Sequence, residues 1–288
     1  MNAEGLPGEP WNLLSPLPKP RGLLFDLDGT LYRGKERVPD ADRLIAQLAE
    51  RGVPHWFVTN NSSRTPEDVA EHLREMGIPA VREQVVTSSL AAADYAAAEF
   101  PGAAAYVIGE PGLKQALAEA GIRVLDEAAD IGERADLVVQ GIDRLLTYAK
   151  LAAASARIRS GAAFVLTNPD LALPSDGGLI PGAGSIGAAL RAASGHEPTV
   201  IGKPSSILMD YALKRAGLAA EQVWVVGDNP LTDIAAAVRA GCPSVLTLTG
   251  VCSASDWESS CRRAEAFPNA VCAGLDELRR LLLHHGMM

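Results

Sequence analysis

Two aspartates separated by one residue, Asp26 and Asp28, follow an apolar run and could do phosphate chemistry. In an extended segment, residues two apart project to the same side of the backbone. One carboxylate could then attack phosphorus as a nucleophile while the other moves protons. Gly29 follows the two acids and lets the backbone turn away sharply. Because Asp and Gly are also common in ordinary turns, the meaning of this segment depends on the rest of the chain.

Three other apolar runs end in polar residues that suit the same chemistry. They lead into Thr59-Asn60, into Lys203, and into Asp228 with Asp233 after it. Thr59 and backbone N–H groups could donate hydrogen bonds to phosphoryl oxygens, and Lys203 could add a positive charge. Taken singly, Thr59-Asn60 is typical of a loop cap, Lys203 of a solvated lysine and Asp233 of an acid in the first turn of a helix.

Mg²⁺ is the cofactor that these residue types indicate. Asp26, Asp28 and Asp228 could hold it, because this hard cation takes carboxylates, carbonyls and substrate phosphate as ligands. The cation would offset the repulsion between an anionic nucleophile and an anionic phosphate. In an open parallel sheet, ligands bind outside the carboxyl ends of the strands. We therefore expect the polar segments to meet at one site.

The elements that must position these residues form an alternating pattern of short apolar runs and amphipathic stretches, which favours parallel sheets covered by helices. We expect strands at 23–25, 56–58, 85–87, 106–108, 137–139, 164–166, 199–201, 223–226 and 244–248. We expect helices at 42–51, from 65 to near 77, and at 89–100, 113–120, 148–159, 185–193, 205–216 and 231–240. So many strands fit two sheets better than one.

The four polar segments together resemble the haloacid dehalogenase superfamily of phosphohydrolases. Its motifs correspond to residues 26–32, 59–66, 202–204 and 227–234, so the resemblance covers nearly everything after residue 20. The spacing is similar to the branch with a large α/β cap after the second motif. That branch includes para-nitrophenyl, phosphoglycolate and sugar-phosphate phosphatases. The segments 167–170 and 181–185 also look like that branch.

The resemblance implies a role for each matching residue. Asp26 would be the nucleophile that forms an aspartyl-phosphate. Asp28 would protonate the leaving oxygen and then activate the water that cleaves the intermediate. The phosphoryl group would be bound by Thr59, Asn60 and Lys203.

The resemblance also implies a metal site and a substrate-reading loop. Mg²⁺ would be ligated by Asp26, by the main-chain carbonyl of Asp28 and by Asp228, with Asp233 in a supporting position. A loop of the cap would cover the site and read the leaving group. Its candidate specificity residues are Asn168, Asp170 and Leu171. An ordinary surface loop is the alternative.

We therefore expect an α/β fold with a Rossmann-like parallel-sheet core and an inserted α/β cap domain. Residues 1–20 would form an N-terminal tail, 21–88 and 197–288 the core, and 89–196 the cap. The expected activity is Mg²⁺-dependent hydrolysis of small phosphate monoesters, such as sugar phosphates, phosphoglycolate or glycerol phosphate. A phosphotransferase or mutase on the same core is the main alternative.

A dinucleotide-binding oxidoreductase is a weaker alternative. It depends on the G-x-G-x-x-G pattern at 182–187, which no adequate first strand precedes and no suitably spaced acid follows. A tight turn into a cap helix is the better interpretation.

Composition limits the partners. The net charge of −9 opposes binding to nucleic acid and to anionic membranes. No apolar run approaches the roughly 18 to 20 residues that span a bilayer, and the acidic, proline-rich start is unlike a secretory signal. The four cysteines have no metal-ligand spacing, as in a reduced cytoplasmic protein. The expected partner is a small phosphorylated metabolite, and the resemblance implies a cap-mediated homodimer.

Overall fold

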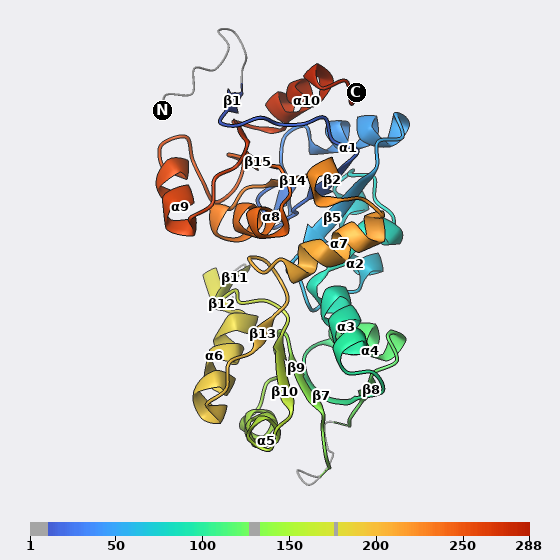
Figure 1. Cartoon of the computed structure of the whole chain (residues 1–288), viewed down its shortest axis with the longest axis vertical. Helices are drawn as coiled ribbons and strands as arrows, with labels where there is room; N and C mark the ends of the chain where they lie inside the picture. The colour runs from blue at the N-terminus through green and yellow to red at the C-terminus, as the bar shows by residue number, and fades with distance from the viewer. Residues whose placement is uncertain (1–10, 127–132, 176–177) are drawn as a thin grey trace. The chain divides into compact units, whose positions relative to one another are not determined.

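The computed structural model describes residues 11–126, 133–175 and 178–288. It divides into two compact units (Figure 1). Unit 1 comprises the chain up to Thr59 together with residues 69–86 and 203–288, and unit 2 comprises residues 60–68 and 87–202. In each unit, strands alternate with helices around a largely parallel sheet. The expected α/β class with a parallel-sheet core is confirmed.

A seven-stranded sheet forms the centre of unit 1. Its strands are β1 (Asn12–Leu13), β2 (Gly22–Phe25), β5 (His55–Thr59), β6 (Val85–Thr87), β14 (Val223–Gly227), β15 (Ser244–Thr247) and β16 (Ala270–Cys272). They lie in the order β1-β16-β15-β14-β2-β5-β6. Central β2 pairs in parallel with both β14 and β5, so all three carboxyl ends lie at one edge. Every residue of β2 is buried, which is typical of a central strand in a parallel sheet.

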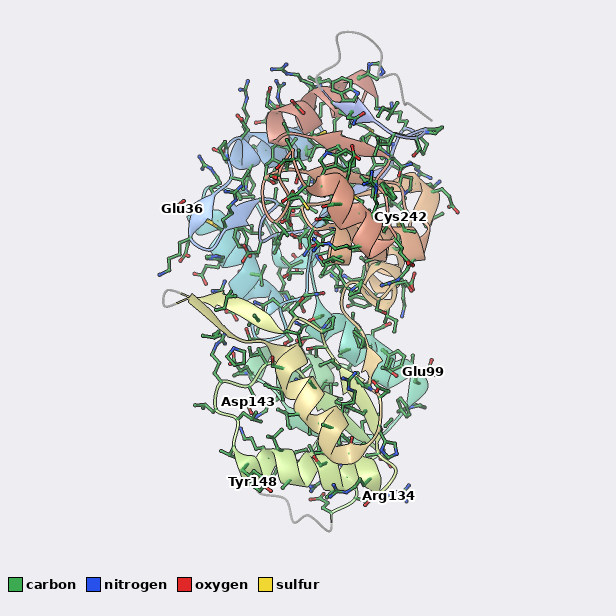
Figure 2. All side chains as sticks on the ribbon, turned by 90° about the vertical axis from the view of Figure 1, so that its left-hand side faces the viewer. Glu36, Glu99, Arg134, Asp143, Tyr148 and Cys242 are labelled. Atoms are coloured by element: carbon green, nitrogen blue, oxygen red, sulfur yellow. The ribbon has the colours of Figure 1, made fainter. Side chains whose placement is uncertain are left out.

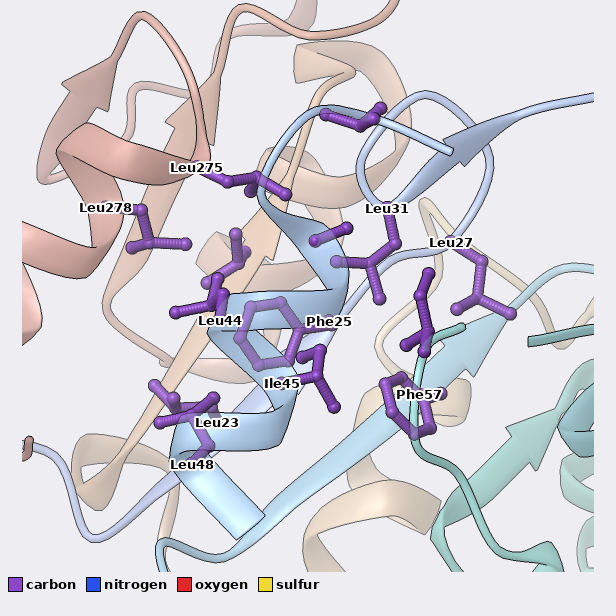
Figure 3. Close-up of a cluster of buried hydrophobic side chains, with 14 of the residues drawn as sticks. Leu23, Phe25, Leu27, Leu31, Leu44, Ile45, Leu48, Phe57, Leu275 and Leu278 are labelled. Carbon is purple, nitrogen blue, oxygen red and sulfur yellow. The ribbon is translucent and has the colours of Figure 1, made fainter. Parts of the chain in front are cut away.

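Helices cover the sheet of unit 1 and close its hydrophobic core. The helices are α1 (Ala41–Glu50), α2 (Pro66–Glu75), α7 (Ile207–Ala216), α8 (Ala235–Ala240), α9 (Trp257–Ala264) and α10 (Leu275–His284). Leu44 and Ile45 of α1 join Leu275 and Leu278 of α10 in one buried cluster with Phe25 of β2 (Figure 3). Full burial of each such side chain contributes about 1.5–3 kcal/mol. This packing holds β2, and the aspartates after it, in place.

Short elements complete unit 1. They are the 3₁₀ turns at Arg82–Gln84 and Ala220–Gln222, the hairpin of β3 (Tyr32–Arg33) and β4 (Glu36–Arg37), and a π-helical turn at Pro230–Ile234. The π-helical turn leads directly into α8, whereas the sequence predicts one regular helix over 231–240. The sequence patterns indicate no helix or strand after residue 248, whereas the structure has α9, β16 and α10 there.

Part of the expected N-terminal tail is ordered sheet. Residues 1–10 lie outside the described residues, but β1 pairs antiparallel with β16 at the sheet edge. The indole Nε1 of Trp224 donates a hydrogen bond to the carbonyl oxygen of Pro18, at 2.8 Å. The segment expected as a tail is therefore attached to unit 1 at residues 12 and 13 and at Pro18. A strand of only two residues, in a segment rich in proline, is too short to show the alternation of apolar and polar residues that predicts a strand.

Unit 2 contains a five-stranded parallel sheet in the order β13-β10-β9-β7-β8. Its strands are β7 (Ala104–Ile108), β8 (Arg123–Val124), β9 (Leu137–Gln140), β10 (Ala163–Leu166) and β13 (Thr199–Val200). Its helices are α3 (Ser88–Glu99), α4 (Pro111–Glu119), α5 (Tyr148–Arg159) and α6 (Ala183–Ser194). Tyr148, at the start of α5, projects into solvent (Figure 2). Strand β13 was expected to open the second core segment, but it pairs with β10 in this sheet.

A small antiparallel hairpin precedes α6. It consists of β11 (Ala172–Ser175) and β12 (Gly178–Pro181), where the sequence predicts only a long loop. The glycine-rich segment follows β12 and begins α6 at Gly182, as the turn interpretation predicts. A Cβ atom at Gly182 or Gly184 would collide with the backbone of Asp170 or Pro169, so close packing explains these glycines. None of the helices in the described part of the chain is long and apolar enough to span a membrane.

Candidate active site

The site begins where β2 and β14 end side by side. Their register pairs Phe25 with Val226, and the N–H of Asp26 donates to the carbonyl oxygen of Val226 at 2.8 Å. Asp228 follows β14 directly, so both aspartates leave the sheet at the same edge. The π-helical turn after Asn229 then brings Asp233 back to this edge, where its carboxylate accepts a hydrogen bond from the Asn229 N–H at 3.1 Å.

Lys203 joins these acids from a distant part of the chain. Its ammonium contacts the carboxylate of Asp26, lies 2.7 Å from Asp233 Oδ1, and reaches the carbonyl oxygen of Val58 at 3.3 Å. Its side chain is only 3% exposed. Burial alone would lower the pKa of Lys203, but the charges of Asp233 and Asp26 outweigh it and raise that pKa above its ordinary value. The lysine is therefore a permanent cation within the cluster.

Asp26, Asp228 and Asp233 form a group that fits a divalent cation. Each offers a carboxylate oxygen, and the three oxygens lie within 4.8 Å of one another. Burial and the nearby charges of Asp233 and Asp228 raise the pKa of Asp26 well above its ordinary value, although Lys203 acts in the opposite direction. Burial and Asp233 raise the pKa of Asp228 to about 7. One lysine does not balance three carboxylates, and a hard cation with oxygen ligands would complete the charge balance.

Thr30 is a member of the site to which sequence reasoning gave no role. It is completely buried, and its hydroxyl lies 3.2 Å from Asp26 Oδ2 and 3.3 Å from Asp228 Oδ1. The hydroxyl can donate to either carboxylate and so keeps the two together. The sequence could have indicated this role, because a threonine directly after Asp-Leu-Asp-Gly, if buried, requires a hydrogen-bond partner nearby.

Asp28 stands apart from the three clustered carboxylates. Its residue is exposed, and burial of part of its carboxyl group raises its pKa. A hydrogen bond from the Gly34 backbone and the nearby His72 act in the opposite direction. Among the described residues, the cluster that could hold a metal ion does not include the Asp28 side chain. A ligand role for Asp28 therefore depends on its main-chain carbonyl, as the resemblance implies.

Thr59 and Asn60 are neighbours in the chain but belong to different units. Thr59 is the last residue of β5, next to the carbonyl of Val58 that Lys203 reaches. Thr59 is therefore held at the same sheet edge as Asp26. Asn60 lies within unit 2, where its side-chain amide donates to Asp170 Oδ2 at 3.1 Å.

Comparisons with known proteins place the chain in a family. Residues 23–123 match the family of haloacid dehalogenase-like hydrolases, and residues 200–278 match a second family described as HAD-hydrolase-like. The 5′-nucleotidase YutF of Bacillus subtilis is 46% identical over 231 residues, which cover 80% of this chain and 88% of that protein. The chain belongs to the haloacid dehalogenase superfamily.

Other members of this superfamily are similar over most of the chain. The acid sugar phosphatase of Staphylococcus aureus is 44% identical over 82% of this chain and 89% of its own length. A solved structure of the glycerol phosphate phosphatase of Mycobacterium tuberculosis in complex with calcium is 42% identical. It covers 82% of this chain and 68% of that one, with a TM-score of 0.76. This haloacid dehalogenase superfamily member is a phosphatase, a hydrolase of phosphoric monoesters.

The candidate specificity residues of this superfamily member lie within unit 2. Asp170 Oδ2 accepts hydrogen bonds from Asn60 and, at 2.7 Å, from the amide of buried Asn168. Thr167 in turn donates to Asn168 Oδ1 at 2.9 Å. Leu171, just before β11, is 65% exposed. The network holds Asn168 and Asp170 rigidly, whereas Leu171 is available to a ligand. Their roles in substrate selection stay predictions.

Proposed function

We propose that this phosphatase hydrolyses small phosphate monoesters through a phosphorylated Asp26, with Mg²⁺ as its cofactor. The observation that supports this most directly is the ammonium of Lys203 against the Asp26 carboxylate, beside two further buried acids. A buried cation next to a carboxylate favours the ionised nucleophile, despite the burial that raises the pKa of Asp26.

In the first half of the reaction, a carboxylate oxygen of Asp26 attacks phosphorus. The bond from phosphorus to the leaving oxygen breaks, and Asp28 gives its proton to that oxygen. The raised pKa of Asp28 suits a group that must carry a proton before it acts. Its exposed position also leaves it within reach of solvent water.

In the second half, a water molecule attacks the phosphorus of the aspartyl-phosphate. Asp28 takes a proton from this water, and the bond between phosphorus and Asp26 breaks. Inorganic phosphate leaves, while Asp26 is again a carboxylate and Asp28 again carries a proton. The same residue thus serves as acid and then as base, as microscopic reversibility allows.

Mg²⁺ would be held by Asp26, the main-chain carbonyl of Asp28 and Asp228, with Asp233 supporting them. When bound, the cation supplies positive charge that offsets the repulsion between the nucleophile and the phosphoryl oxygens. Lys203, Thr59 and Asn60 would bind those oxygens, where charge is spread in the transition state. The three clustered acids support a divalent metal at this place, and the structure of the glycerol phosphate phosphatase in complex with calcium supports a divalent cation in a similar protein.

The substrate we propose is a small phosphorylated metabolite. The similar proteins are named for nucleotides, sugar phosphates and glycerol phosphate, which share a phosphate monoester on a small polar leaving group. Asn168, Asp170 and Leu171 would select that group. The enzyme would act in the cytoplasm, as a homodimer through unit 2.

Trapping the intermediate tests the proposal. With para-nitrophenyl phosphate, the leaving group departs without a proton, so the Asp28→Asn variant should still phosphorylate Asp26. It should then stall, because the base for the second half is missing. Intact-mass spectrometry should find one phosphoryl group per chain, and peptide mapping should place it on Asp26. A label on another residue would contradict the mechanism. Transfer to an added sugar in preference to water would favour a phosphotransferase.

A further inference from the structure

Two glycines from separate segments pack against the carboxylate of Asp228. Gly29, with a φ of +94°, and Gly250, in the loop after β15, both approach Asp228 Oδ2. A Cβ atom at either position would collide with the Asp228 carboxylate. The backbone of both segments therefore packs directly against Asp228, which is only 1% exposed. The N–H of Val251 donates to Asp228 Oδ2 at 2.7 Å.

Thr249 connects the two glycine segments. Its hydroxyl donates to the carbonyl oxygen of Gly29 at 2.7 Å and lies 3.0 Å from the hydroxyl of Thr247. Thr247 in turn reaches the carbonyl oxygen of Gly227 at 3.4 Å. Both threonines are buried. The loop after β15 is thus attached to the loop after β2, and Asp228 lies between them.

A residue of the β3–β4 hairpin also restrains this loop. Arg33 of β3 donates from Nε to the carbonyl oxygen of Thr249. Both residues also line an open cavity of about 740 Å³. The hairpin that carries Arg33 lies at the surface, where Glu36 projects from β4 (Figure 2). The hydrogen bonds of the Thr249 hydroxyl and carbonyl oxygen therefore restrain a loop that borders open space.

We propose that residues 249–251 are a positioning loop that fixes the Asp228 carboxylate in the orientation that binds the divalent cation. The Val251 N–H holds Oδ2, and the Thr30 hydroxyl, which also reaches Asp26, lies beside Oδ1. The carboxylate therefore cannot rotate freely, and its orientation toward Asp26 is set before a cation arrives. Groups that orient a metal ligand typically alter metal affinity by about 10- to 100-fold when they are lost. The inference rests on the proposed function, since it requires a bound cation.

A pair of glycine substitutions tests whether the close contact between the loop backbone and Asp228 matters for metal binding. Gly250→Ala puts a methyl group against the Asp228 carboxylate at a position that needs no positive φ. Gly274→Ala is the matched control, because a Cβ atom there meets nothing within 4 Å. Calorimetric titration of the metal-free proteins with Mg²⁺ should give a dissociation constant about 10- to 100-fold higher for Gly250→Ala and unchanged for Gly274→Ala.

A threonine series tests the same loop without steric conflict. Thr249→Val keeps the shape and removes the hydroxyl, whereas Thr249→Ser keeps the hydroxyl. Thr249→Val should weaken Mg²⁺ binding by about 10- to 100-fold, and Thr249→Ser should restore it. Circular dichroism of the metal-free proteins checks that each variant is folded.

The outcomes separate this inference from the proposed function. If the wild-type protein binds Mg²⁺ and both Gly250→Ala and Thr249→Val bind it equally well, the positioning role is wrong while the metal-dependent function stands. If the wild-type protein binds no divalent cation, both are overturned. Weaker binding in these two variants, with recovery in Thr249→Ser, establishes the loop as a positioning element for Asp228.

Discussion

The ammonium of Lys203 contacts the carboxylate of Asp26, although 177 positions separate the two residues in the chain. The contact exists because β2 and the segment that begins at Lys203 belong to the same unit. Along the chain, all residues of unit 2 lie between them. We expect Asp26→Asn to reduce kcat by at least about 10³-fold, because it neutralises the proposed nucleophile and removes a proposed metal ligand. Circular dichroism should show an intact fold. Residual turnover close to that of wild type would contradict the assignment.

Replacing the lysine should cost both stability and activity. In Lys203→Met, the buried carboxylates of Asp26 and Asp233 lose their partner, and removing one member of a buried ion pair typically costs about 3–5 kcal/mol. Urea unfolding in EDTA measures this loss. Lys214→Met, at an exposed position of α7, is the control and should change stability by less than about 0.5 kcal/mol. Equal stability of the two variants would argue against a balanced charge cluster.

Without metal, the site should make the protein less stable as pH rises. The pKa of Asp228 is raised to about 7 from 3.8, so the folded protein holds this proton over a range in which the unfolded chain has lost it. Stability should therefore fall between about pH 4 and pH 7, by up to about 1.4 kcal/mol per pH unit. Asp228→Asn should flatten this dependence in urea unfolding with EDTA, and Mg²⁺ should reduce it in wild type.

His55 should act on stability in the opposite direction. It is buried at the start of β5, with Nδ1 2.8 Å from the carbonyl oxygen of Val53 and Nε2 3.0 Å from the amide of Gln84. Burial lowers its pKa, so below about pH 6.5 the unfolded chain takes up a proton that the folded protein does not. The contribution of neutral His55 to the unfolding free energy is fully present above about pH 6.5 and is lost as the pH falls. Comparing wild type with His55→Gln at pH 7.5 and pH 5.5 isolates the effect, and identical pH slopes would refute it.

Substrate preference should respond to Leu171 and not to Leu179. Both leucines are exposed, at 65% and 77%, so truncating either should leave the unfolding free energy nearly unchanged. If residue 171 contacts the leaving group, Leu171→Ala should change the ratio of kcat/KM between two phosphorylated metabolites by about 10-fold. Leu179→Ala on β12 is the matched control. A panel of sugar phosphates, glycerol phosphate and nucleotides provides the measurement.

The sequence was most informative where strand ends carry chemistry. Parallel strands of one sheet present their carboxyl ends at one edge, so Asp26 and Asp228 could be placed together from their positions after apolar runs. Lys203 follows β13, which belongs to the other sheet, so its expected place beside Asp26 is supported by the family resemblance and not by strand geometry. Thr249 and Gly250 gave no such signal. Thr249 acts through a hydrogen bond from its hydroxyl to a backbone carbonyl, and Gly250 acts through the absence of a Cβ atom. Both effects depend on where the loop after β2 lies in the folded protein, which no local sequence pattern indicates.

Local patterns also failed where tertiary pairing decides the structure. The strand at Thr199–Val200 looks the same in sequence whichever sheet it joins, and its pairing with β10 is a long-range outcome. The π-helical turn at Pro230–Ile234 has the composition of an ordinary helix start, yet it is what turns Asp233 back toward Lys203. The hairpin of β11 and β12 contains proline and glycine, which hide strand alternation.

The division of the chain has a consequence for synthesis on the ribosome. The nascent polypeptide emerges with Asp26 first, and every residue of unit 2 must be translated before Lys203 appears. Until then, β2 is present without β14 beside it, and Asp26 is present without Lys203. Unit 2 therefore has the chance to fold while the candidate active site is still incomplete. A fragment that stops short of Lys203 would contain Asp26 but neither Lys203 nor Asp228.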